Sequence, residues 1–537
     1  MQLRNESTEG SAAWEKWAFW AVLALQILPV WLFRYFPSHD GPIHIYNCLV
    51  LKDIFTSQHG IAQTYYTLNP QFPLNVLAHV LLTALTFVAS PLVAEKLFLT
   101  IYAVTLGLSA RYALASIRRQ SLFLSFLILP TVFNFTVYMG FYNFIIAIPI
   151  FFWTFGYWRR NAADLRWPKV AVLTAAFLVM YLAHLFVVAC AFLIIGIVVL
   201  KAVLCSQTLR FWRVPEFRTA YAALPAAALA AYFIIKRSVP TKYNNPLHSL
   251  RDLFHDNFIV SFYAGETVIA IAFFLFIALA TAWQIRNSAK RGASWKSDGY
   301  LIALAVGLFM YVVASNEMIG GGYTRIRLLL FVVFTNLFWL AQFHYSRRFI
   351  RFTQYLSIAM ALSLALFHAN AYRMLNPYLA EYASASGVMA TGKSMLALNY
   401  SVKGRTASGK RISRRAGPFR HADAYVGIER RLALIDNYEA TTLLFPLIFL
   451  PGQNPFPAMA DLYDEPPCAD LDAYVAATHR PMDYVMVWFP EAEEPGNACV
   501  ERVRKHLREN YARIYSSPRN LAHVYRLKGG VAEAVGR

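Results

Sequence analysis

The 537-residue chain has few acidic residues, few cysteines and little charge of either sign. Asp and Glu number 30 against 50 Lys and Arg, five residues are cysteine, and only 15% are charged. The sequence contains no P-loop, no G-x-G-x-x-G and no H-E-x-x-H motif, which argues against nucleotide-binding and zinc-protease classes. What the chain has in excess is apolar residues, at 58%. A soluble globular protein of this length is much less apolar, so the composition predicts a polytopic membrane protein.

Apolar runs of membrane-spanning length repeat between residues 17 and 371. A helix needs about 17 to 25 apolar residues to cross a bilayer. One run, 170–200, is long for a single crossing at about 1.5 Å per residue and short for two. Including it, the sequence predicts eleven or twelve spans, within an expected range of about 11–13. The other ten runs are 17–36, 72–90, 93–115, 121–138, 140–158, 217–236, 259–284, 298–315, 323–343 and 350–371.

The formal net charge of +20 is distributed as expected for a membrane protein. Lys and Arg lie mainly in short loops between apolar runs, which the positive-inside rule assigns to the cytoplasm, and no nucleic-acid partner is expected. The runs 72–90 and 93–115 conflict with this pattern, because two full crossings would place Arg118 and Arg119 outside. Either one of these runs is a partial, re-entrant or in-plane helix, or the charge bias fails locally.

Polar segments flank the predicted membrane domain. The C-terminal segment has the composition of a small soluble domain of α/β or α+β type, with expected buried strands at 425–426 and 484–488 and an amphipathic helix at 499–511. Cys468 and Cys499 both fall in it and could pair or remain two free thiols. The predicted organisation is a cytoplasmic tail 1–16, a membrane domain 17–371 with a first external loop 37–71, a linker 372–417 and an extracytoplasmic domain 418–537.

A polar cluster follows the first apolar run directly, in the segment PSHDGPIHIYNCLVLKD. Asp40 precedes Gly41-Pro42, a step at which one helix cannot continue from the preceding turn. A carboxylate at the mouth of a membrane cavity needs a partner or a chemical task. Asp40 is therefore a candidate catalytic group, with an N-cap carboxylate as the structural alternative. A divalent metal ion could also be held here, since imidazole and carboxylate both bind such ions. The suggested ligands are His39, Asp40 and His44.

The order of these elements resembles the GT-C superfamily of integral membrane glycosyltransferases, which take sugar from a polyprenyl-phosphate carrier. Those enzymes have a first helix, an external loop with an essential acidic residue, a Pro-rich start of the second helix, many further spans and often a C-terminal soluble domain. In this chain, Asn69-Pro70 to Pro73 supplies the Pro-rich step. The resemblance covers nearly the whole chain through short motifs, and His39-Asp40 stands where the family often has paired acids. It implies that Asp40 is the general base, with Asp53 as second choice.

A polyprenyl-phosphate donor requires cations at the outer membrane face, because the leaving phosphate must be stabilised. Arg325 and Arg327 lie at the start of an apolar run, where the family also carries a phosphate-binding arginine; snorkelling to headgroups or a pair with Glu317 is the alternative. Lys242 and Tyr243 lie in a basic loop predicted outside. The expected donor-binding residues are His39, His44, Tyr46, Lys242, Tyr243, Arg325 and Arg327. His184 could line the cavity, or be satisfied by one neighbouring hydrogen bond.

Taken together, the sequence predicts a glycosyltransferase of the bacterial inner membrane. It would move a sugar, with inversion, from a polyprenyl-phosphate donor to a glycan, lipid or protein acceptor outside the cytoplasm. One alternative is a transporter or flippase of a lipid-linked substrate, which should show mid-helix polar groups and an inverted repeat. Another is a non-catalytic scaffold whose soluble domain binds a partner protein through 421–425 and 436–439. In that alternative Asp40 is dispensable.

Overall fold

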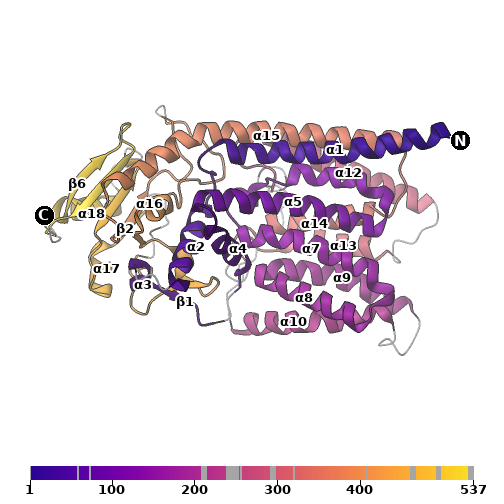
Figure 1. Ribbon diagram of the computed structural model, residues 1–537, viewed down its shortest axis with the longest axis horizontal. Helices are drawn as coiled ribbons and strands as arrows, with labels where there is room; N and C mark the ends of the chain where they lie inside the picture. The colour runs from indigo at the N-terminus through magenta and orange to yellow at the C-terminus, as the bar shows by residue number, and fades with distance from the viewer. Residues whose placement is uncertain are drawn as a thin grey trace. The chain divides into compact units, whose positions relative to one another are not determined.

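A computed structural model shows a mainly helical chain whose residues form two compact units (Figure 1). The first unit comprises 1–32, 99–137 and 143–369, and the second comprises 33–98, 138–142 and 370–537. The structure describes residues 2–56, 60–71, 74–206, 214–236, 253, 255, 257–290, 298–317, 321–406, 409–459, 462, 467–490 and 497–529.

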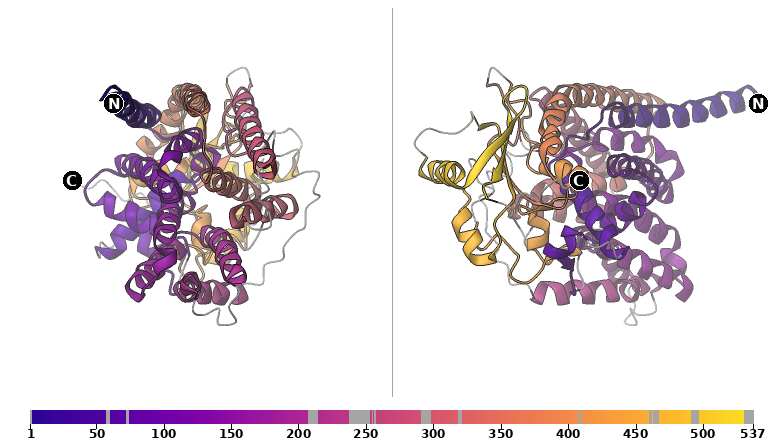
Figure 2. Two further views of the ribbon diagram at one scale, coloured as in Figure 1. Left: turned by 90° about the vertical axis from the view of Figure 1, so that its right-hand side faces the viewer. Right: turned by 60° about the vertical axis from the view of Figure 1, so that its left-hand side comes forward.

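The first unit is a helical bundle, seen with many helices nearly end-on in Figure 2 (left). Helices α5 and α15 begin and end, respectively, within the second unit. The α-helices are α1 (Gln2–Leu32), α5 (Pro91–Ile117), α6 (Phe135–Tyr138), α7 (Tyr142–Asn161), α8 (Trp167–Ala183), α9 (Leu185–Cys205), α10 (Arg218–Lys236), α12 (Glu266–Lys290), α13 (Gly299–Val313), α14 (Thr324–Leu340) and α15 (Arg347–Ala383). Short 3₁₀ helices are η1 (Arg119–Thr131), η2 (Ala162–Asp164) and η4 (Pro215–Phe217).

Among the residues that the structure describes, six helical segments are long and apolar enough to cross a membrane, judged by length and composition. They are Pro91–Ile117, Arg119–Tyr138, Leu185–Cys205, Pro215–Lys236, Glu266–Lys290 and Arg347–Val388. Three shorter apolar helices are Leu77–Thr86, Trp167–Ala183 and Gly299–Val313. These segments make the chain an integral membrane protein. The lower number, against about 11–13 from the sequence, arises partly because several apolar runs contain helices that are shorter than the runs themselves.

Two ambiguities of the sequence have a structural answer. The run 72–90 contains only α4 (Leu77–Thr86), whose 10 residues extend about 15 Å and cannot cross a bilayer. Of the alternatives left open for the basic pair at 118–119, this length agrees with a partial helix. The run 170–200 forms two helices, α8 and α9, which are separated at His184. His184 has extended backbone angles, and its ring accepts a hydrogen bond from Phe186 N at 3.2 Å.

The second unit contains a five-stranded sheet with strand order β3-β2-β5-β7-β6. Figure 2 (right) shows its C-terminal strands in yellow. β2 pairs in parallel with β3 and β5, whereas β7 pairs antiparallel with β5 and β6, so the sheet is mixed. A separate antiparallel pair joins β1 to β4. The strands are β1 (Tyr66–Leu68), β2 (Ser394–Asn399), β3 (Ala433–Leu434), β4 (Leu447–Phe449), β5 (Tyr484–Trp488), β6 (Tyr511–Ser516) and β7 (Ala522–Leu527).

The helices of this unit include α2, which follows the apolar run 17–36. They are α2 (Gly41–Phe55), α3 (Ile61–Tyr65), α4, α16 (Asp423–Arg430), α17 (Leu471–Thr478) and α18 (Ala498–Asn510), with 3₁₀ helices η6 (Ser384–Val388) and η7 (Tyr438–Thr441). The small C-terminal sheet domain, the strand at 484–488 and the helix near 499–511 are confirmed. The strand expected at 425–426 is wrong, because these residues lie in α16. An apolar pair is too short to show the period that separates a strand from a helix.

Residues 372–417, expected as a linker, contribute to this unit's secondary structure. They contain the end of α15, η6 and β2. β2 lies between β3 and β5 in the sheet, and all six of its residues are buried. The sheet therefore draws on chain that precedes residue 418.

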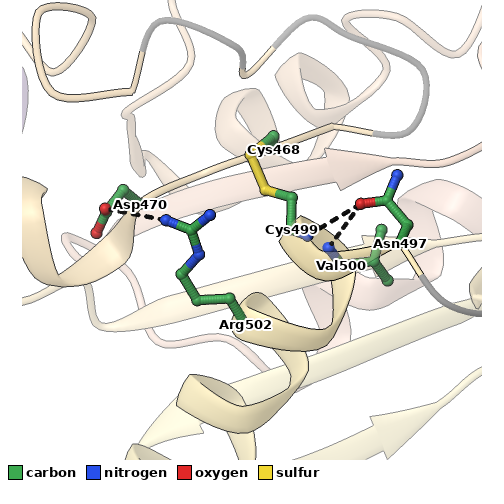
Figure 3. Close-up of a disulfide and its surroundings, with 6 residues drawn as sticks. All are labelled: Cys468, Asp470, Asn497, Cys499, Val500 and Arg502. Carbon is green, nitrogen blue, oxygen red and sulfur yellow. Dashed lines mark hydrogen bonds and ion pairs between the residues drawn. A yellow bond between two sulfur atoms is a disulfide. The ribbon is translucent and has the colours of Figure 1, made fainter.

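A disulfide joins Cys468 to Cys499, which settles the two alternatives that the sequence left open (Figure 3). Their Cα atoms lie 5.6 Å apart, inside the usual range for bridged cysteines. Cys499 lies in the first turn of α18. There the Asn497 side chain accepts hydrogen bonds from the backbone N–H groups of Cys499 and Val500 at 3.0 and 3.3 Å. The disulfide thus ties the chain before α17 to the capped start of α18.

Candidate functional site

Asp40 lies at the start of α2, and its carboxylate is buried between two histidines. Its Oδ1 lies 3.7 Å from both His39 Nε2 and His421 Nε2. Within the described part of the chain, the Asp40 side chain accepts no capping hydrogen bond from α2, so the N-cap alternative is not what the structure shows. Burial raises the pKa of Asp40 to about 7, although the charge of His44 acts in the opposite direction. At neutral pH this carboxyl is therefore poised between its acid and its base forms.

The two flanking histidines are neutral at that pH. Burial, with the positive charge of Arg420, lowers the pKa of His39 to about 3. Burial and the neighbouring His39 lower the pKa of His421 well below its usual range. A neutral imidazole carries no positive charge that would favour the carboxylate anion. Burial therefore has the largest effect on the pKa of Asp40.

A glycine holds the backbone of Asp40 in place. His39 N and Asp40 N donate hydrogen bonds to the carbonyl oxygens of Tyr138 and Met139, at 2.8 and 3.2 Å. The next residue, Gly140, has φ +74°, and a Cβ there would lie 2.4 Å from Gly41 N. Only glycine accepts both this left-handed conformation and this close approach. The segment before α7 therefore fixes the start of α2.

A second cluster lies one helical turn further along α2. His44 Nδ1 is 2.7 Å from Glu439 Oε1, and His79 Nε2 is 3.1 Å from Glu439 Oε2. All three side chains are buried. Burial alone would raise the pKa of Glu439, but the charge of His44 and the hydrogen bonds of the two histidines outweigh it and hold that pKa well below the usual range. Burial alone would lower the pKa of His44, yet Glu439 raises it overall.

A buried acidic pair lies beside His421. Asp423 at the start of α16 and Asp436 after β3 are both buried, and they cluster with His421. Burial, followed by the charge of Asp436, raises the pKa of Asp423 well above its ordinary value. Burial raises the pKa of Asp436 to about 7. Two carboxyl groups this close hold one proton between them more readily than none.

The residues that the sequence suggested as metal ligands separate into two clusters. His39 and Asp40 group with His421, whereas His44 groups with His79 and Glu439. The set His39, Asp40 and His44 is thus not the one that the fold brings together. Four residues along a helix advance about 6 Å, which is enough to move His44 away from the Asp40 carboxylate and toward different partners. The structure does contain buried His/Asp/Glu groups able to hold a metal ion.

Tyr46 and Asp53, also on α2, have structural partners. The Tyr46 hydroxyl donates to Leu432 O at 2.8 Å and accepts from Leu434 N at 3.3 Å. Asp53 forms an ion pair with Arg431 near the other end of α2. Both contacts attach α2 to the chain around β3.

Arg325 and Arg327 lie in the first unit, in the first turn of α14, and both are buried. The Arg327 guanidinium stacks over the Phe144 ring at 5.3 Å, and its Nη1 lies 3.5 Å from His184 Nε2. His184 and Arg327, singled out separately in the sequence, are therefore neighbours. Lys242 and Tyr243 lie outside the described residues.

Sequence reasoning missed His79 and Glu439 as members of a site. Glu439 lies 360 residues from His79 along the chain, and no local spacing links them. The segment 436–439 drew attention only as a partner-binding surface of the scaffold alternative. A signal did exist in the density of polar groups in Asp436-Asn437-Tyr438-Glu439, which follows a short apolar stretch.

Comparisons with known proteins give structural matches only. No family model and no curated protein sequence matches the chain. The crystal structure of ArnT from Cupriavidus metallidurans in the apo state matches with a TM-score of 0.54 and 9% identity, over 96% of this chain and 98% of that one. The same protein bound to undecaprenyl phosphate gives 0.53 and 9%, over 98% and 99%. An oligosaccharyltransferase of Archaeoglobus fulgidus tethered with an acceptor peptide gives 0.45 and 10%, over 96% and 74%. The likeness to ArnT over nearly the full length of both chains shows the fold, and this integral membrane protein has the GT-C fold that its sequence resembles.

Proposed function

We propose that this protein is a membrane glycosyltransferase that moves a sugar from a polyprenyl-phosphate donor to an acceptor outside the cytoplasm, with Asp40 as the general base. The observation that carries the proposal is the buried Asp40 carboxyl, with a pKa of about 7, between two neutral histidines. A general base works best when its pKa is near the operating pH, because it is then largely deprotonated yet still basic.

The proposed reaction is a single nucleophilic displacement at the anomeric carbon of the sugar. Asp40 takes the proton of the acceptor hydroxyl as its oxygen forms a bond to the anomeric carbon of the sugar. The bond between that carbon and the phosphate oxygen breaks, and the polyprenyl phosphate leaves with the electron pair. Attack opposite the leaving group inverts the anomeric carbon. His39 and His421 would orient the carboxyl.

The donor is proposed from the fold and from the buried arginines. One of the two ArnT structures of this fold has undecaprenyl phosphate bound, which supports a polyprenyl phosphate here. Arg325 and Arg327, which are buried in the first turn of α14, would stabilise the leaving phosphate, because cations offset its developing charge. Lys242 and Tyr243 would assist. His44 and Tyr46, given their contacts to Glu439 and Leu432, would position α2.

The disulfide supports an extracytoplasmic site. Disulfides persist in oxidising compartments and are rare in the cytosol, so the bridge between Cys468 and Cys499 favours a C-terminal domain on the outer side of a bacterial inner membrane. Single cysteines introduced at exposed positions of α18 should react with a membrane-impermeant thiol reagent in intact cells. Protection of every such cysteine would contradict this orientation.

The decisive experiment compares two isosteric variants on one helix. Purified protein in lipid is assayed for sugar transfer with a panel of polyprenyl-phosphate sugars and extracted membrane acceptors, as wild type, Asp40→Asn and Asp53→Asn. Loss of a general base should reduce the rate by about 100-fold or more. We expect that loss in Asp40→Asn, with folding intact, and near wild-type activity in Asp53→Asn, whose carboxylate pairs with Arg431.

Other outcomes of this assay separate the alternatives. A loss in Asp53→Asn alone would move the base to Asp53. Wild-type protein that transfers no sugar from any donor would contradict the enzyme proposal, and a lipid-flipping assay on the same vesicles would then test the transporter alternative.

A further inference from the structure

We propose that His44, His79 and Glu439 form a binding site for one divalent transition-metal ion, best matched by zinc. The three residues come from α2, α4 and η7, and all are buried. Two imidazoles and one carboxylate are a ligand set found in zinc enzymes. This inference does not rest on the proposed sugar transfer.

The distances among the ligand atoms match those around a common ion. With zinc–nitrogen bonds of about 2.0–2.1 Å in a tetrahedral site, two ligand nitrogens lie about 3.3–3.4 Å apart. His44 Nδ1 and His79 Nε2 are 3.5 Å apart. The same nitrogens lie 2.7 Å from Glu439 Oε1 and 3.1 Å from Oε2. Each pair of ligand atoms is thus within reach of one shared centre.

The hydrogen bond of His79 Nδ1 shows which ring nitrogen is available to bind a metal ion. His79 Nδ1 lies 3.1 Å from the carbonyl oxygen of Asn75, and since a carbonyl only accepts, Nδ1 carries the proton. Nε2 faces Glu439 Oε2 at 3.1 Å, where it donates a hydrogen bond while protonated and would present its lone pair to a metal ion once that proton is lost. Metal-bound histidines commonly donate their other N–H to a backbone carbonyl in this way. The His44 ring likewise hydrogen-bonds the backbone of Gly140.

The carboxylate is oriented by a second layer of amides. Asn47 Nδ2 donates to Glu439 Oε2 at 2.7 Å, and Asn437 Nδ2 donates to Asn47 Oδ1 at 2.7 Å. The Glu439 carboxylate thus offers one oxygen to each imidazole: Oε1 lies 2.7 Å from His44 Nδ1, and Oε2 lies 3.1 Å from His79 Nε2. A divalent ion that replaced the protons between these atoms would be held by all three side chains.

The test measures metal content and needs no enzymatic assay. Full-length protein carrying a non-histidine affinity tag is reconstituted in lipid nanodiscs and titrated with Zn²⁺, with bound metal quantified by mass spectrometry. Wild type should bind about one zinc per chain, as a single three-ligand site requires. His79→Ala should bind zinc at least about 100-fold more weakly, since even loss of outer-shell support costs 10–100-fold. The control is His479→Asn, at an exposed residue with φ 54° outside the cluster.

A second variant keeps the inference testable if His79→Ala fails to fold. His79→Cys replaces one metal ligand by another, so it should retain Co²⁺ and add a thiolate-to-cobalt absorption band that wild type lacks. Three results would overturn the site: no zinc bound by wild type, equal zinc in His79→Ala, or no thiolate band in His79→Cys. If wild type binds no zinc, hydrogen bonds and ion pairs alone hold the three side chains together. These measurements need no sugar transfer, so the metal site and the role of Asp40 as a base are tested by separate experiments.

Discussion

The two clusters beside the first half of α2 contain the same kinds of side chain, one carboxylate and two histidines, and reach opposite electrostatic states. Asp40 lies 3.7 Å from both of its histidines, and burial raises its pKa to about 7. Glu439 contacts its histidines at 2.7 and 3.1 Å and accepts from Asn47, and its pKa is held below the usual range. Burial is nearly complete in both cases. Direct contact to the charged form, more than burial, decides whether a carboxylate remains an anion or becomes a proton acceptor.

Among the variants that test this comparison, Glu439→Gln should cause the largest change, a loss of stability. Removing one partner of a buried charged cluster costs about 3–5 kcal/mol, so thermal unfolding in lipid should move to a clearly lower temperature. Asp40→Asn should leave the unfolding temperature nearly unchanged or raise it, because that carboxylate is poorly compensated. Equal effects of the two variants would contradict the distinction between the clusters.

A pH series should show the next largest effect. Sugar transfer should rise as pH increases through about 7, since Asp40 must lose its proton to act as a base. The pKa of Asp40 is raised above its ordinary value of 3.8, so its contribution to stability is fully present below pH 3.8 and is lost as pH rises through about 7. Activity and stability should therefore change in opposite directions across this window.

Several charged or titratable groups act on Asp40 and set this window. They are His39, His44, Arg420, His421, Tyr438 and Glu439. A rate that is independent of pH between 6 and 8 would contradict the assignment of Asp40, whereas a stability change without a rate change would assign it a purely structural role.

The smallest expected effect comes from Tyr438→Phe. The Tyr438 hydroxyl donates a hydrogen bond to Asp40, which lowers the pKa of that carboxyl. Its removal should shift the midpoint of the pH–rate profile upward while leaving the maximal rate within a few-fold of wild type. The shift should be absent in Tyr46→Phe, because that hydroxyl bonds the backbone of Leu432 instead. A downward shift in Tyr438→Phe would show that the bond favours the protonated acid.

The fold was more predictable than the site, for a physical reason. Apolar run length and turn chemistry are local, so the membrane helices, the start of α2 at Gly41-Pro42, the strand at 484–488 and the helix near 499 could be read from the sequence. Asp40 stood out because a carboxylate beside a membrane run is unusual. Its partner His421 and the Glu439 cluster come from chain hundreds of residues away, and no periodicity encodes such pairing. The structure groups the suggested metal ligands differently, with His39 and Asp40 beside His421 and with His44 beside His79 and Glu439, because neighbours in sequence are not always neighbours in space.

The pairing of β1 with β4 has a consequence for the timing of maturation. Tyr66–Leu68 bonds to Leu447–Phe449, and a ribosome adding about 5–20 residues per second takes roughly 20 to 75 s to make the chain between these strands. During that interval the segment 37–71 exists without its partner strand, and α2 exists without Glu439. A chain that ended before residue 439 would therefore lack both the strand that pairs with β1 and the Glu439 carboxylate, even where its membrane helices were complete.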